Sequence, residues 1–118
     1  MQYLLLIYHE EAQWDAVSEP DKQKIYQGFG ALRFDLQQTG KYVGGNQLQP
    51  IATATTVRIR NGKTAITDGP FAETKEQLGG YIMVEAGNLD DAISIAARIP
   101  LAATGSIEVR PIVVRPAQ

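Results

Sequence analysis

The sequence predicts a small α+β domain, and three observations carry this prediction. Two segments have the apolar spacing of amphipathic helices, and each begins with a residue that favours helix capping. Strand-length apolar segments precede and follow both helices. Two more strand-like segments flank Asn61-Gly62, a dipeptide typical of tight hairpins because both residues tolerate positive φ. With this hairpin set aside, the element order is βαββαβ, which is the ferredoxin-like plan.

Composition narrows the class of protein. A chain of 118 residues is the size of one domain, which we assign to residues 1–118. It has no cysteine, which excludes disulfides and thiolate metal sites, and a single histidine argues against a transition-metal site. The net charge of −2 is spread along the chain, which argues against a nucleic-acid partner. No apolar run could span a bilayer or serve as a signal peptide, so we expect a cytoplasmic protein without a membrane partner.

The first strand is predicted over residues 3–8, where apolar side chains are continuous rather than alternating. Continuous apolarity is typical of a strand that is covered on both faces. His9 follows directly, and we interpret residues 13–15, around Trp14, as a loop.

A long helix is predicted to begin at Ser18, with Pro20 in its first turn and Asp21 at the capping-box position. Gly40 suits its left-handed end. Its apolar stripe consists of Ile25, Phe29, Leu32 and Leu36. Gly28 and Gly30 flank Phe29, and we attribute them to close packing against the sheet.

The middle of the chain is predicted to be strand-rich. A short strand begins at residue 42 and breaks at Gly44-Gly45, and residues 46–53 form a loop or a ragged edge strand. The hairpin strands are residues 55–60 and 63–67, and another strand covers residues 80–85.

The last third of the chain is predicted to form a short helix and a final strand. Asn88 caps the helix, with Asp91 three residues later, and the helix ends near Pro100. Its expected stripe is Ala92, Ile93, Ala96 and Ala97. Residues 101–105 are interpreted as a loop and residues 106–114 as the last strand, in which Glu108 and Arg110 share one face.

The predicted fold leaves one sheet face bare. Both helices would cover a single face, yet the first strand has the composition of one covered on both. We therefore expect a second copy to cover the other face, which gives a homodimer of the α+β-barrel type.

Several segments resemble a known family over nearly the whole chain. They are residues 3–8, 48–50, 53–58, 68–81, 97–100 and 105–112, and residues 68–71 read Asp-Gly-Pro-Phe. The chain resembles the YciI-like (YCII-related) family, in the subgroup named for its DGPF motif. This resemblance implies a dimeric ferredoxin-like α+β barrel and a suggested His–Asp active-site pair, which His9 and Asp68 match by position. It also implies a link of some relatives to sigma factors of the extracytoplasmic-function type.

Each candidate site residue has a structural alternative. His9 could act as a general base oriented by Asp68, or bond a backbone carbonyl in a loop. Asp68 could instead accept backbone N–H groups and hold its turn closed. Phe71 is interpreted as a packed anchor or a ligand platform. The remaining candidates are Glu73 and Lys75, together with Glu76, as a salt-bridged or gating loop, and Glu108 and Arg110 as a dimer ion pair or an anion-binding group.

The leading hypothesis is a homodimer that binds a small polar metabolite without a cofactor. We expect the cleft between the helix-free sheet face and residues 68–75, with His9 and Asp68 at its floor. The first alternative is an enzyme that uses the His9–Asp68 pair for lyase, isomerase or hydrolase chemistry. The second is a regulatory partner protein without a ligand. The sequence contains no phosphate-binding loop, nucleophile elbow or dinucleotide fingerprint.

Overall fold

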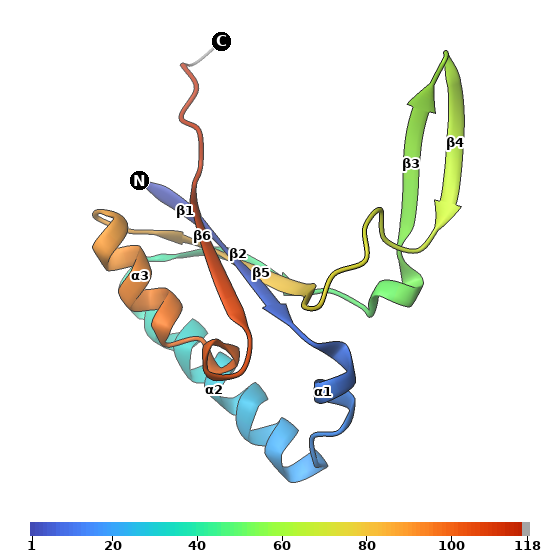
Figure 1. Cartoon of the computed structure of the whole chain (residues 1–118). Coiled ribbons are helices and arrows are strands. Elements are labelled where there is room, and N and C mark those ends of the chain that lie inside the picture. Colours follow the sequence, from blue (N-terminus) through green and yellow to red (C-terminus); the bar gives the residue numbers. More distant parts are fainter. Residues whose placement is uncertain (117–118) are drawn as a thin grey trace.

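The computed structural model describes residues 1–116 of the chain (Figure 1). Its elements, in order, are β1 (Gln2–His9), α1 (Glu11–Asp15), α2 (Glu19–Gln38), β2 (Tyr42–Gln47), η1 (Ile51–Thr53), β3 (Thr55–Arg60), β4 (Lys63–Asp68), β5 (Gln77–Glu85), α3 (Leu89–Ala97), η2 (Pro100–Ala103) and β6 (Ser106–Pro111).

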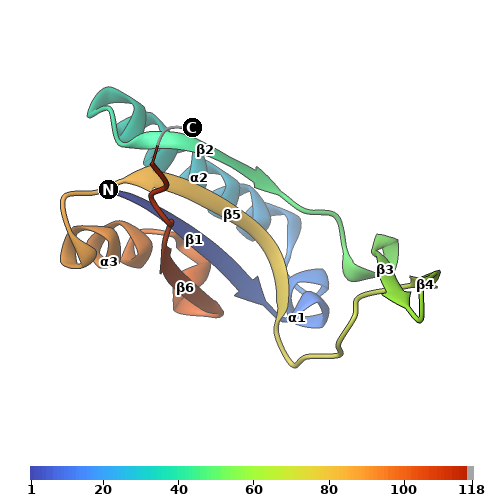
Figure 2. The same cartoon turned by 90° about the horizontal axis from the view of Figure 1, so that it is seen from above.

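A four-stranded antiparallel sheet has the order β2-β5-β1-β6. With the β3–β4 hairpin set aside, this is the strand order of a ferredoxin-like fold, so the predicted fold class is confirmed. Both long helices, α2 and α3, lie on one face of this sheet (Figures 1 and 2). The opposite face carries no helix, and we call it the open face.

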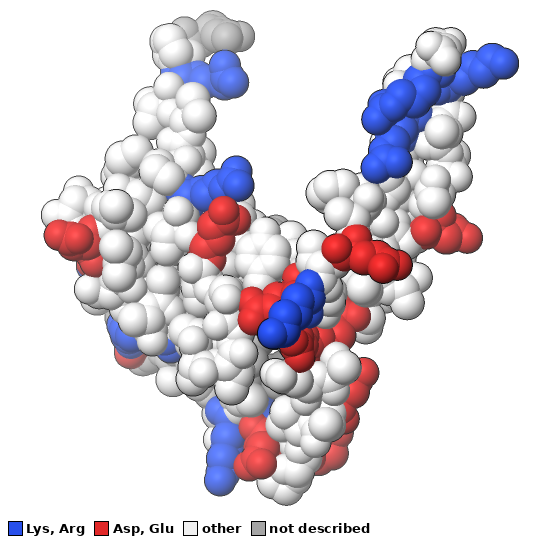
Figure 3. All heavy atoms as spheres, in the orientation of Figure 1, with Lys and Arg blue, Asp and Glu red and all other residues white. Residues whose placement is uncertain are grey.

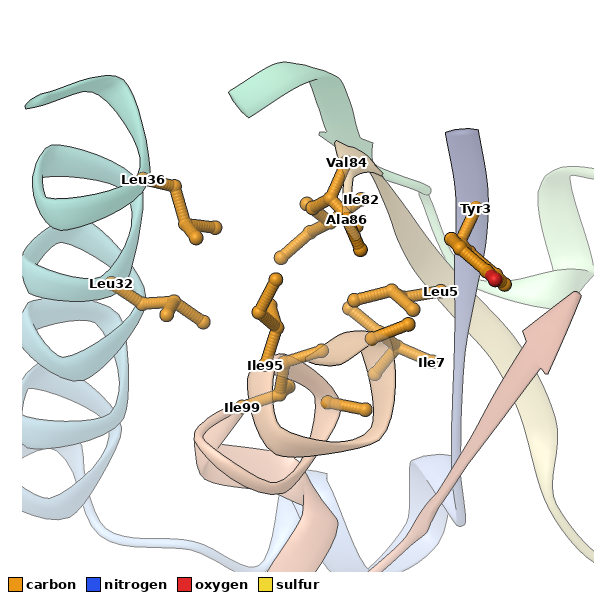
Figure 4. Close-up of a cluster of buried hydrophobic side chains, with 12 residues drawn as sticks. Tyr3, Leu5, Ile7, Leu32, Leu36, Ile82, Val84, Ala86, Ile95 and Ile99 are labelled. Atoms are coloured by element: carbon orange, nitrogen blue, oxygen red, sulfur yellow. The ribbon is translucent and has the colours of Figure 1, made fainter. Parts of the chain in front are cut away.

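The core fills the space between the sheet and the two helices (Figure 4). Leu5 and Val84 from the central strands and Leu36 from α2 are almost completely buried. Along β1, buried and half-buried residues alternate, so that Leu4 and Leu6 face the open side and are only half-buried. Full burial of β1 on both faces therefore does not occur within one chain.

Local capping signals are found where the sequence predicts them. The Ser18 hydroxyl accepts a hydrogen bond from the Asp21 backbone N–H at 3.3 Å, and Asn88 Oδ1 accepts one from Asp91 at 2.9 Å. Gly40 ends α2 with φ of 71°. These bonds form between residues three positions apart, which is why the sequence alone predicts them.

The predicted hairpin forms a separate two-stranded sheet, β3–β4, which we call the arm (residues 55–68). Asn61 and Gly62 form its turn with φ of 53° and 73°. The arm projects from one end of the domain toward the side of the open face (Figure 1).

Three predicted loops or breaks are wrong. Residues 11–15 form the short helix α1, and residues 100–103 form η2. The strand β2 does not break at Gly44-Gly45 but continues to Gln47, with a register shift near Gly44. A Cβ at Gly45 would lie 2.8 Å from the Tyr81 carbonyl oxygen, so this glycine permits close pairing of β2 with β5.

Two helix details also differ from the prediction. A Cβ at Gly28 would lie 2.8 Å from Cγ of Pro100, so Gly28 packs against η2 rather than the sheet, whereas a Cβ at Gly30 would meet no atom within 4 Å. In α3 the buried residues include Ile95, and Ile93 is 48% exposed. The stripe of α3 is therefore rotated from the expected one.

Candidate functional site

A cavity of about 360 Å³ lies between α2 and the sheet. Figure 2 shows α2 behind β2 and β5, which form the opposite wall. The lining residues are Ile7, His9, Trp14, Ile25, Tyr26, Phe29, Gly30, Arg33, Tyr42, Gly45, Asn46, Gln47, Gly79, Gly80, Tyr81, Ile82 and Leu101.

Glycines give the sheet side of the cavity its shape. The His9 imidazole occupies the position that a Cβ at Gly79 would take. A Cβ at Gly80 would lie 2.9 Å from the Asn46 carbonyl oxygen. Because the sheet presents backbone here instead of side chains, His9 lies directly against the strand and space remains beneath α2.

Aromatic rings contact one another in one part of the cavity wall. The Trp14 ring lies edge-on to the His9 ring, with centroids 6.1 Å apart, and to the Tyr26 ring at 5.7 Å. The Lys22 ammonium group lies 5.3 Å from the Trp14 ring centroid. These contacts join the end of β1, α1 and the first turns of α2 around the cavity.

The short helix α1 is held in place by hydrogen bonds from distant elements. The Glu11 backbone N–H donates to Gln77 Oε1 at 2.9 Å, and the Glu11 carboxylate accepts from the Ile51 backbone N–H at 3.0 Å. These two bonds tie α1 to β5 and η1, and thereby fix the position of Trp14.

The charge of the cavity wall has one sign. Among the described residues, the lining contains no aspartate or glutamate, and Arg33 supplies its permanent positive charge. The Arg33 guanidinium carbon lies 5.1 Å from the Tyr42 ring centroid. A wall of this kind suits a neutral or anionic molecule better than a cation.

Comparison with known proteins assigns the family. The model of the YCII-related domain matches residues 1–115. An uncharacterised protein of Rhizobium meliloti (strain 1021) is 36% identical over 114 residues, which cover 95% of this chain and 92% of that protein. The chain belongs to the YCII-related domain family. Membership agrees with the resemblance noted in the sequence.

Of the predicted site residues of this YCII-related chain, His9 alone lines the cavity. Asp68 ends β4 in the arm, opposite Thr55, and is exposed. Among residues 1–116, no hydrogen bond joins His9 to Asp68. A single chain therefore does not bring the two residues of the predicted pair together at this cavity.

The predicted ligand residues of the loop after the arm lie outside the cavity. Phe71 is 78% exposed, and its carbonyl oxygen accepts a hydrogen bond from Arg58 at 3.5 Å. Glu73 is exposed, and Lys75 lies 4.0 Å from the Glu10 carboxylate. The position of Lys75 matches the structural alternative, a solvated loop with a weak ion pair.

Glu108 and Arg110 lie on the open face of β6 and contact each other at 3.3 Å. The Tyr8 hydroxyl donates to the Glu108 carboxylate at 3.5 Å. This pair forms within one strand of one chain. It is remote from the cavity beneath α2, because its side chains point to the other face of the sheet.

Sequence reasoning missed most of the cavity wall, including Trp14, Tyr26, Arg33 and Tyr42. One signal was present, since Arg33 follows Ile25 and Phe29 at intervals of four residues and so shares their face of α2.

A second, smaller cavity of about 110 Å³ adjoins the first, and both are lined by His9 and Trp14. In the described part of the chain, no group of three or more acidic, histidine or cysteine side chains is placed to hold a metal ion. None of the helices within residues 1–116 combines the length and apolarity needed to cross a bilayer.

Proposed function

We propose that this YCII-related protein is a homodimer that binds a small metabolite in the cavity between α2 and the sheet. The observation that carries the proposal is the cavity itself. Its volume of about 360 Å³ falls in the range of small-molecule sites, roughly 300–1,000 Å³. Its wall is mostly apolar and aromatic with a few polar groups, as such sites usually are.

The site proposed here differs in place from the cleft expected from the sequence. The expected cleft lay on the open face, beside residues 68–75, whereas the cavity lies on the helix-bearing face. His9 belongs to both descriptions. His9 lies in the cavity wall, and Asp68 has no role in ligand binding by the same chain.

Two exposed apolar surfaces support the homodimer. The open face carries half-buried Leu4 and Leu6. One face of the arm carries Val57, Ile59 and Ile66, which are 61%, 67% and 69% exposed. An isolated two-stranded hairpin is marginally stable in water, so the arm needs a partner surface. A second copy would cover both surfaces.

The arm and the last described residues rise on the same side of the sheet (Figure 1), and the space-filling view shows a hollow between them (Figure 3). The opposite face of the arm carries Arg58, Arg60 and Lys63, seen as a basic cluster (Figure 3). We propose that a second open face packs between these two projections. The Asp-Gly-Pro-Phe sequence at residues 68–71 supports membership in the DGPF subgroup, and the resemblance to this subgroup implies a dimeric α+β barrel.

The binding proposal is tested by a metabolite screen with a thermal-shift readout, because a ligand that binds the folded state raises Tm by mass action. The blocking variant is Gly30→Leu, which places a side chain at the cavity wall where a Cβ meets no atom within 4 Å. We expect hits that raise Tm of the natural chain and leave that of Gly30→Leu unchanged.

The matched control is Ala31→Leu, which adds the same side chain one position away, on the exposed side of α2. It should keep the response to every hit. Hits that stabilise Gly30→Leu as strongly as the natural chain would place their binding elsewhere, and a complete absence of hits would refute the proposal.

A second candidate function is proton-transfer catalysis with His9 as the base, and the position of His9 in the cavity wall favours it. The test is His9→Ala, assayed for conversion of the hits by mass spectrometry. Turnover that is lost while binding remains would support catalysis. Hits that bind and are recovered unchanged after incubation with the natural chain would contradict catalysis and support binding only.

A further inference from the structure

We infer that the ligand of this cavity is a small organic anion, with an apolar body beneath α2 and a carboxylate-like group at Arg33. This inference rests on the proposed function and adds the chemical class of the ligand. It follows from three features of the wall: an unpaired cation, the position of that cation over an aromatic ring, and a lining without opposing acids.

Arg33 is one of six basic residues among residues 1–116 that have no carboxylate within 4.0 Å, and of these six it is the one that lines the cavity. Five other basic side chains lie within 4.0 Å of a carboxylate, and these are Lys22, Lys41, Lys75, Arg98 and Arg110. The clearest contrast is Arg98, also exposed, whose guanidinium lies 2.6 Å from the Asp35 carboxylate. Within residues 1–116, no carboxylate lies within 4.0 Å of Arg33.

The Arg33 guanidinium also lies over an aromatic ring. Its central carbon is 5.1 Å from the centroid of the Tyr42 ring. The guanidinium carries its N–H donors in a planar fork. Among the described residues, these groups donate no hydrogen bond within the chain. A planar carboxylate matches this fork with two parallel hydrogen bonds.

The rest of the wall favours an apolar body and disfavours a cation. Trp14, Tyr26 and Phe29 present aromatic surface to the cavity. A ligand ammonium group would face Arg33 and find no carboxylate among the described lining residues. The wall therefore selects by both attraction and repulsion, which is how binding sites discriminate between ligands of one shape.

The experiment compares matched acids and amides, with phenylacetate and phenylacetamide as the first pair, at neutral pH. Trp14 is the only tryptophan of the chain and lines the cavity, so its fluorescence reports binding directly. We expect the acid to bind about tenfold more tightly than the amide, the usual scale for a charge-assisted hydrogen bond.

The decisive variant is Arg33→Gln, which should lower the affinity of the acid to that of the amide and leave the amide unchanged. The control is Arg58→Gln, which removes an equal charge from the arm and should preserve the difference. Circular dichroism checks that both variants fold.

Each remaining result overturns the inference. Equal binding of acid and amide, or a preference that survives Arg33→Gln, would contradict the role of Arg33 while leaving the binding function intact. The same holds if the panel fails to bind and the metabolite screen yields neutral or cationic hits that Gly30→Leu blocks. If neither the panel nor the screen yields any binder, the inference and the proposed function fall together.

Discussion

Asp91 is the described residue whose protonation is most clearly coupled to folding. Its carboxylate accepts a hydrogen bond from the Gly87 backbone N–H at 2.9 Å and contacts the Lys41 ammonium at 3.1 Å. The Gly87 bond first, and then Lys41, lower the pKa of Asp91 below its usual 3.8. A carboxylate whose pKa is lower in the folded state than in the unfolded state stabilises the fold at pH values above the unfolded-state pKa. This contribution is lost as the pH falls through the folded-state pKa.

The variant Asp91→Asn should therefore unfold at lower urea concentration than the natural chain at pH 7. The difference should shrink as the pH falls below the usual value of 3.8, because the natural carboxylate is then protonated and, like the asparagine side chain, carries no charge. Urea midpoints at several pH values measure this. A difference that stays constant into acid would show that the charge of Asp91 is irrelevant.

Gly28 and Gly30 should respond oppositely to alanine. A glycine in a helix interior costs about 0.5–1 kcal/mol relative to alanine, so Gly30→Ala should raise the free energy of unfolding by about that amount. At Gly28 the added Cβ would lie 2.8 Å from the Pro100 ring, so the clash should cancel or reverse the gain. Urea unfolding of both variants measures the difference, and equal stabilisation would contradict the packing of α2 against η2.

At the scale of elements, the sequence predicts the helix ends and turns that depend on residues close together in the chain. The caps at Ser18 and Asn88 and the turn at Asn61-Gly62 are local, and all three are confirmed. The helix α1 was missed because five residues without a side-chain cap carry little helical signal, and bonds from Gln77 and Ile51 hold it.

Contacts with residues distant in the sequence also explain why the roles of two glycines were not predicted. Gly44-Gly45 look like a strand break in the sequence, but in the structure Gly45 allows the backbone of β5 to approach. The partner of Gly28 is Pro100, far away along the chain. His9 is the cavity residue that the sequence predicted as a site residue, and the others were missed because they come together from α1, α2, η2 and three strands.

The arm should be removable without unfolding the domain. It pairs with no strand of the four-stranded sheet, and the Gly69 backbone N–H donates to the Ala54 carbonyl at 2.7 Å, so the two ends are already adjacent. A chain in which a short glycine linker replaces residues 55–68 should keep its helical circular dichroism and cooperative unfolding. Its dimer affinity should fall at least about tenfold, since three exposed apolar residues of the arm are lost.

Sedimentation velocity measures that affinity. Loss of cooperative unfolding would show that the arm supports the single-chain fold, and an unchanged dimer would show that the arm contacts something other than a second copy.

At the scale of the whole molecule, we propose that a second copy of the chain packs on the open face. We expect a dimer at micromolar concentration and a monomer for Leu6→Glu, because a buried unpaired carboxylate at the centre of the interface is strongly unfavourable. Sedimentation velocity distinguishes the two. The control is Phe34→Glu on α2, where the aromatic ring is 60% exposed and lies away from the open face, so this variant should remain a dimer.

A dimer that survives Leu6→Glu would place the interface elsewhere, and a monomeric natural chain would leave the open face to another partner.

The cavity beneath α2 is the centre of the account, and the indole N–H resonance of Trp14 tests it most directly. A hit from the screen should shift this signal together with the His9 ring signals in two-dimensional NMR, and Gly30→Leu should abolish both shifts. Shifts confined to the arm or to β6 residues such as Glu108 and Arg110, with the Trp14 and His9 signals unchanged, would contradict binding in the cavity beneath α2.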